Sequence, residues 1–129
     1  LPFKNKQTLV ITQVETAEGL RNCEEIAAVE GVDSLAVGAN DMTFSLGIHG
    51  QFEHPLFIDA MQRVIAACQR HGKIGKCHPH HPAQIGEFSR MGYRMMMGNS
   101  DVSHLRQAVK GTMDNLRRGV QESAASRTS

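Results

Sequence analysis

Two acidic residues and an amide side chain stand where apolar runs of this sequence end. Gln13 and Glu15 close the run TLVITQVE, and Asp41 follows the run SLAVG by three residues. Gln13 and Glu15 are two positions apart, so in an extended strand both side chains lie on the same face. Mg²⁺ in proteins usually takes one or two carboxylates and completes its shell with water and substrate oxygens. The spacing therefore makes Glu15 and Asp41 candidate ligands of one divalent cation.

The same residues also have an ordinary structural explanation. An acidic residue before a helix often caps it, and an Asn-Asp pair is common in turns. Gly38 and Ala39 carry little or no side chain, so a ligand would be able to approach the backbone N–H groups beside Asp41. Spacing alone does not decide between a metal site and a capping role for the two acids.

The elements that must position these residues alternate in type along the chain. Short apolar runs at 8–14, 34–38, 73–77 and 93–98 are typical of strands, and a loop follows the second run through Gly50. Periodic segments at 16–29, 54–72, 81–92 and 100–120 predict amphipathic helices. Strands that alternate with helices pair in parallel, and ligands gather at their carboxyl ends. The methionines at 95–97 are expected to fill the core at the last strand.

Four strand–helix units fit either a small open sheet or the C-terminal half of a (β/α)₈ TIM barrel. Their nearly equal pitch favours the α/β half-barrel, as a fragment of a longer chain. We expect residues 1–122 to form the βα repeats and residues 123–129 to form a flexible polar tail. A half-barrel leaves two sheet edges open, so an N-terminal half of the barrel, on the same or another chain, is an expected partner.

Composition indicates a soluble chain and argues against several classes of partner. A formal charge of +1, one Tyr and no Trp give no electrostatic or stacking case for nucleic acid or an anionic membrane. No segment approaches the roughly 18 apolar residues that a membrane span needs. Cys23, Cys68 and Cys77 lack any repeated spacing and suit free thiols in a reducing compartment, so we expect a cytoplasmic protein.

Three motifs occur in an order that resembles a known enzyme family. They are Q-x-E at 13–15, G-V-D at 31–33, and G-x-x-D followed by S-L-G at 38–47. Over residues 9–118 the chain resembles the HpcH/HpaI aldolase/citrate lyase family of class II, metal-dependent pyruvate aldolases, which includes fungal enzymes of the macrophomate synthase type. The separation of Glu15 and Asp41, 41 − 15 = 26, also agrees with that family.

The resemblance implies a divalent-metal-dependent carbon–carbon lyase that cleaves or decarboxylates a 2-oxo acid through a metal-stabilised enolate. Glu15 and Asp41 would hold Mg²⁺, or Mn²⁺, Co²⁺ or another divalent cation. Gln13 would hydrogen-bond pyruvate or oxaloacetate, and the backbone around Asn40 and Asp41 would bind its carboxylate. The acid/base His and Arg of the family would come from the N-terminal half of the barrel, and the enzyme would be a homo-oligomer.

Two features depart from the family pattern. Ala39 stands where Pro is common, and the loop Cys77-His78-Pro79-His80-His81 does not match bacterial aldolases, which leaves the acceptor specificity open. This loop has four interpretations: a His-rich strand end, a substrate-facing His78, a metal site, or a nucleophilic Cys77. Two functional alternatives also remain: a citrate-lyase-like acyl-CoA lyase, and a catalytically incomplete half-barrel that acts as a binding or assembly subunit.

Overall fold

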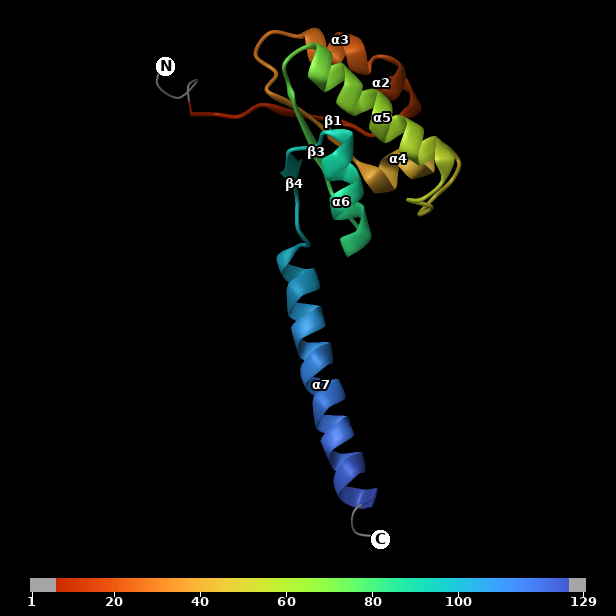
Figure 1. Ribbon diagram of the computed structural model, residues 1–129, viewed down its shortest axis with the longest axis vertical. Helices are drawn as coiled ribbons and strands as arrows, with labels where there is room; N and C mark the ends of the chain where they lie inside the picture. Colours follow the sequence, from red (N-terminus) through yellow and green to blue (C-terminus); the bar gives the residue numbers. More distant parts are fainter. Residues whose placement is uncertain (1–6, 126–129) are drawn as a thin grey trace. The chain divides into compact units, whose positions relative to one another are not determined.

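A computed structural model describes residues 7–125, which fall into two compact units (Figure 1). The first unit, up to Met97, contains all the strands and the shorter helices. The second, from Gly98 onward, contains one helix, α7 (Asp101–Ala125). No helix within 7–125 combines the length and apolarity that crossing a bilayer requires.

The first unit is an α/β structure built on a parallel sheet. Its four strands are hydrogen-bonded in chain order: β1 (Ile11–Val14), β2 (Ser34–Val37), β3 (Ile74–Cys77) and β4 (Met95–Met96). The helices between them are α2 (Ala17–Arg21), α3 (Cys23–Ala28), α4 (Ala39–Ser45), α5 (Pro55–Arg70) and α6 (Pro82–Met91). Parallel neighbours joined by helical crossovers confirm the predicted alternation of strands and helices.

One face of the sheet is buried, and the other is exposed at β1 and β3 but not at β2. Val14, Val37 and Cys77 project from the buried face and are at most 5% exposed. Helix α5 packs on β2, β3 and α3, and its buried residues recur every three or four positions, which gives the helix one apolar stripe: Phe57, Ala60, Met61, Val64 and Cys68. From the opposite face project Ile11 and Ile74, which are 37% and 39% exposed. The hydrophobic core therefore lies on one side of the sheet only.

Two segments differ from the sequence-based expectation. The predicted loop after β2 contains α4, a seven-residue helix that buries Met42 and Thr43. The predicted helix over 16–29 is divided at Asn22, which ends α2 and precedes α3. Tertiary burial stabilises α4, whereas its short sequence carries too few residues to show a helical period.

The methionines of the last strand are divided between the two faces, so the prediction that all three lie in the core was wrong. Met96 packs against the core, whereas Met97 is 49% exposed. Successive side chains of a strand point to opposite faces, and only one face of this sheet is covered. The three cysteines are free and buried, as expected of small apolar side chains.

Polar contacts hold the elements of this unit together. The Tyr93 hydroxyl, buried beside β4, donates to the Met61 carbonyl of α5 at 2.8 Å. Burial raises the pKa of Tyr93 far above its usual range, so the hydroxyl remains a donor. On the outer side, Glu24 of α3 accepts hydrogen bonds from Arg70 and His71 at the end of α5, which lower the pKa of Glu24 to about 2.

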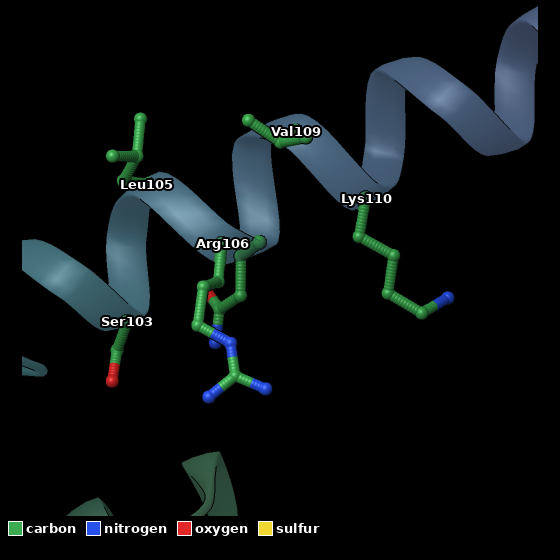
Figure 2. A pocket seen from close by; sticks show the side chains of 6 residues that line it. Ser103, Leu105, Arg106, Val109 and Lys110 are labelled. Atoms are coloured by element: carbon green, nitrogen blue, oxygen red, sulfur yellow. The ribbon is translucent and has the colours of Figure 1, made fainter.

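Helix α7 begins with a capped turn and carries an exposed apolar stripe. The Ser100 hydroxyl accepts the Ser103 N–H at 3.2 Å and so caps the first turn. The helix continues to Ala125, so residues 123–125 are helical rather than part of the expected tail, and residues 126–129 lie outside the described range. Its exposed apolar residues recur every three or four positions: Val102, Leu105, Val109, Met113, Leu116 and Val120. Figure 2 shows the two sides of this amphipathic helix: Leu105 and Val109 point to one side, and Ser103, Arg106 and Lys110 point to the other.

We predict that Tyr93→Phe destabilises the fold by about 1 kcal/mol, the usual net contribution of one buried neutral hydrogen bond. The substitution keeps the aromatic packing against Phe88 and removes only the hydroxyl that the Met61 carbonyl accepts from. Urea denaturation measures the change in the free energy of unfolding. An unchanged or higher free energy of unfolding would contradict the prediction.

Candidate active site

Gln13 and Glu15 lie at the carboxyl end of β1, beside the end of β2. Val14 pairs with Val37, so the next residues, Glu15 and Gly38, are level with each other. Gln13 Nε2 donates to Glu15 Oε2 at 2.6 Å. A Cβ atom at position 38 would lie 2.7 Å from Glu15 Oε2 and 2.8 Å from Gln13 Nε2, closer than packed atoms approach. Glycine at this position therefore provides the space in which the carboxylate and the amide meet.

Asp41 lies in the first turn of α4, the helix that begins directly after Gly38. An acidic residue is stabilised there by the N-terminal end of the helix dipole. The far end of α4 is held beside the start of α2, because the Ser45 hydroxyl accepts the Ala17 N–H at 2.9 Å. The segments that carry Glu15 and Asp41 are thus attached to each other at both ends of α4.

Neither acidic residue has the capping role that was the alternative to a ligand. Helix α2 is capped by Thr16, whose hydroxyl accepts the Gly19 N–H at 2.9 Å. No side chain caps the start of α4. Within residues 7–125, the Asp41 carboxylate has no hydrogen bond or ion pair, and the Glu15 carboxylate accepts only from Gln13.

The residues present fit a hard divalent cation in number and in kind. Two carboxylates from adjacent strand ends, with an amide beside them, are oxygen ligands of the sort that Mg²⁺ takes. The described residues contain no group of three or more His, Cys, Asp or Glu side chains able to hold a metal. A cation at this edge would therefore rely on Glu15 and Asp41 and complete its shell with water or substrate oxygens.

The backbone at the start of α4 offers N–H donors beside Asp41. The first N–H groups of a helix have no partner within it, and Met42 is the first residue of this turn whose N–H reaches back, to the Gly38 carbonyl at 2.8 Å. Asn40 is exposed, and its backbone carbonyl accepts a hydrogen bond from the Thr43 hydroxyl at 2.9 Å. The position suits the carboxylate-binding role expected for the backbone at 40–41.

The His-rich loop after β3 packs against the loop that precedes α5. The His80 ring stacks on Phe52 with centroids 3.7 Å apart and planes within 8°. Gln84, which is 1% exposed, links the two loops because it accepts the His80 N–H at 2.8 Å and donates to the Phe52 carbonyl at 3.4 Å. His81 Nε2 lies 3.1 Å from Glu53 Oε1. Burial, followed by the nearby His78 and His81, lowers the pKa of His80.

Two interpretations of this loop are not supported by its surroundings. Cys77 is 2% exposed and its burial raises the pKa of the thiol to about 11, so the thiolate needed for nucleophilic attack is scarce at neutral pH. The loop also supplies no three-residue metal cluster within the described chain. His78 is different, because its Nε2 is shielded from solvent and has no hydrogen-bond partner there.

Some residues at this edge were not found by sequence reasoning. The Phe52–His80 stack and the Gln84 link join positions far apart in sequence, and no local pattern marks them. Lys76, two residues before His78, repeats the spacing of Gln13 and Glu15, and this K-x-H pattern at a strand end was the signal available.

Comparison with known proteins identifies relatives for most of the chain. A family model described as HpcH/HpaI aldolase/citrate lyase matches residues 3–108. The 5-keto-4-deoxy-D-glucarate aldolase of Klebsiella pneumoniae is 32% identical over 110 residues, which are 85% of this chain and 43% of that protein. A 4-hydroxy-4-methyl-2-oxoglutarate aldolase of Chaetomium globosum is 36% identical over 103 residues, 78% of this chain and 38% of the relative.

Several solved structures superpose on this chain. An HpcH/HpaI aldolase from Desulfitobacterium hafniense superposes with a TM-score of 0.83 and 26% identity over 90% of this chain and 45% of its own. Macrophomate synthase superposes with a TM-score of 0.81 and 25% identity over 94% of this chain and 42% of its own. The chain thus spans less than half the length of these relatives, and the resemblance expected from the sequence motifs is confirmed.

We predict that Phe52→Ala raises the pKa of His80 towards the ordinary histidine value of 6.5. Removal of the stacked ring admits water to the imidazole, and desolvation is the largest cause of the lowered pKa. An NMR titration of the His80 ring protons measures the change. The matched control is Phe44→Ala, which removes an exposed ring that contacts His49 instead. A His80 pKa that is the same in all three proteins would contradict the prediction.

Proposed function

This chain belongs to the HpcH/HpaI aldolase/citrate lyase family, and we propose that it forms part of a divalent-metal-dependent carbon–carbon lyase acting on a 2-oxo acid. The observation that carries the proposal is the pair of carboxylates, Glu15 and Asp41, at the carboxyl ends of neighbouring parallel strands. Within residues 7–125, neither carboxylate forms an ion pair with a basic side chain. Carboxyl ends of strands are where enzymes of parallel α/β architecture bind their ligands.

Each residue of the site has a distinct proposed role. Glu15 and Asp41 hold the cation, Mg²⁺ or a similar divalent ion such as Mn²⁺ or Co²⁺. Gln13 orients Glu15 through their 2.6 Å hydrogen bond and also binds the 2-oxo acid. The free N–H groups at Asn40 and Asp41 receive the carboxylate of pyruvate or oxaloacetate. When bound, the cation supplies Lewis acidity that stabilises negative charge developing on the substrate.

The proposed reaction is a retro-aldol cleavage or the related decarboxylation. The bond between C3 and C4 of the 2-oxo acid breaks, and the C4 hydroxyl loses its proton as it becomes the carbonyl of the released fragment. The electron pair left on C3 takes up a proton to form the methyl group of pyruvate. In decarboxylation of oxaloacetate the same bond breaks and CO₂ leaves. The proton donors and acceptors are proposed to be a His and an Arg of the N-terminal half of the barrel.

The proposal includes completion of a (β/α)₈ barrel by that N-terminal half. Both outer strands of the sheet, β1 and β4, have one unpaired edge among the described elements, and open edges invite pairing. The residues leading into β1, Leu9 and Val10, are 47% and 43% exposed. Relatives about twice as long as this chain support the same completion. Assembly of the barrels into a homo-oligomer is also proposed, on the family resemblance.

We predict that Glu15→Gln in the complete enzyme weakens Mn²⁺ binding at least about tenfold, because loss of even an outer-shell partner of a metal site costs about 10–100-fold. The substitution keeps the shape of the side chain and removes its charge. Calorimetric titration with Mn²⁺ measures the affinity. Deuterium exchange at the methyl group of pyruvate, followed by NMR, should fall at least in parallel, because enolisation needs the cation.

The matched control is Glu18→Gln, which neutralises an exposed carboxylate in the first turn of α2 and should leave both measurements within about twofold. Unchanged affinity and exchange in Glu15→Gln would refute the metal site. If the wild-type enzyme bound Mn²⁺ and pyruvate without any exchange, the lyase assignment would be wrong and a binding subunit would be the remaining function.

A further inference from the structure

Strand register places Lys76 and His78 on the same face of the sheet as Gln13 and Glu15. Gln13 pairs with Ala36, which pairs in turn with Lys76. Paired residues of neighbouring strands project from the same face of a sheet. Two residues further along each strand, the side chains of Glu15 and His78 return to this face, because side chains alternate along an extended strand. Four polar side chains thus project from one face of the sheet.

The strand between these residues carries only small side chains on this face. There β2 and its continuation contribute Ser34, Ala36 and Gly38, of which Ser34 and Ala36 are buried. The space over Gly38 is entered from the β1 side by the Glu15 carboxylate and the Gln13 amide. Two strand spacings, about 10 Å, separate the backbone of β1 from that of β3. The face therefore has an acidic side on β1, small residues on β2 and a basic side on β3.

Two polar groups on the basic side have no partner among the described residues. Within residues 7–125, the Lys76 ammonium forms no ion pair with any acidic side chain. His78 Nε2 is shielded from solvent and also lacks a partner there. Buried polar atoms in proteins are nearly always hydrogen-bonded, so an orphaned polar atom at a strand end indicates a group that binds from outside. A lysine two residues away on the same face indicates that this group is an anion.

We propose that Lys76 and His78 form an anion subsite for the second carboxylate of a dicarboxylic 2-oxo acid. The inference rests on the proposed function, in which the 2-oxo-acid end of the same molecule is bound at Glu15 and Asp41. Lys76 supplies the charge, and the imidazole N–H at Nε2 supplies a directed hydrogen bond. Three bonds of an extended carbon chain cover about 3.8 Å. A five-carbon diacid, reached by side chains from both sides, therefore spans the distance between β1 and β3, whereas pyruvate alone does not.

Two ligands that differ only at the far end test the subsite without turnover. 2-Oxoglutarate carries a terminal carboxylate where 2-oxopentanoate carries a methyl group. Calorimetric titration of the complete, Mg²⁺-loaded enzyme should show at least about tenfold tighter binding of 2-oxoglutarate, the usual size of a charge-assisted hydrogen bond. A wild-type enzyme that binds both ligands equally would overturn the proposal.

Variants then assign the preference to the two residues. Lys76→Met keeps the length of the side chain and should abolish the preference, and His78→Gln should reduce it several-fold. Lys110→Met is the matched control, since Lys110 lies on α7 in an ion pair with Asp114, and the preference should persist there. A preference that survives both Lys76→Met and His78→Gln would overturn the proposal, and His78→Gln supplies the test if Lys76→Met does not fold.

A parallel activity assay separates this proposal from the proposed function. 4-Hydroxy-2-oxoglutarate is cleaved to pyruvate and glyoxylate, and 4-hydroxy-2-oxopentanoate to pyruvate and acetaldehyde. Lys76→Met should lower kcat/KM at least about tenfold for the first substrate only. Equal losses for both substrates would overturn the anion subsite and leave the lyase function intact. A Lys76-dependent preference in binding, without cleavage of either substrate, would refute the lyase function and support the subsite.

Discussion

The close approach of β1 and β2 at Gly38 is the constraint on which the candidate site depends. The Glu15 carboxylate and the Gln13 amide meet where any larger residue would place its Cβ atom. The same glycine ends β2 and begins α4, and the short helix then carries Asp41 at the same edge of the sheet. One small residue thus permits the contact between the strands and sets the start of the helix. Both roles of Gly38 position the carboxylates of Glu15 and Asp41, which form no ion pair within residues 7–125.

Much of this arrangement was predictable, because it rests on local sequence patterns. Short apolar runs and periodic segments gave the strands and most helices, and the Q-x-E pattern placed Gln13 and Glu15 on one face. Helix α4 was not predicted, because its seven residues are held by burial of Met42 and Thr43. The split at Asn22 was not predicted either, because the apolar period continues across it. Local patterns cannot report such tertiary effects.

The His-rich loop after β3 also shows what local sequence patterns cannot predict. The sequence marked the His-rich loop as unusual, yet three of its interpretations depended on contacts that only the fold supplies. The stack of His80 on Phe52 and the Gln84 link give His80 a structural role. His78 Nε2 has no hydrogen-bond partner within residues 7–125, and the alternation of side chains along the strand places His78 on the same face as Lys76. A metal site and an anion subsite on one sheet face would together select a substrate with charge at both ends.

The most direct test of this account is an anomalous diffraction experiment on crystals of the complete enzyme soaked in Mn²⁺. The account predicts one strong peak at the carboxyl edge of the sheet, with an oxygen of Glu15 and an oxygen of Asp41 each about 2.1 Å from it. A peak bound by other residues, or two carboxylates directed away from each other with no ion between them at saturating Mn²⁺, would contradict it.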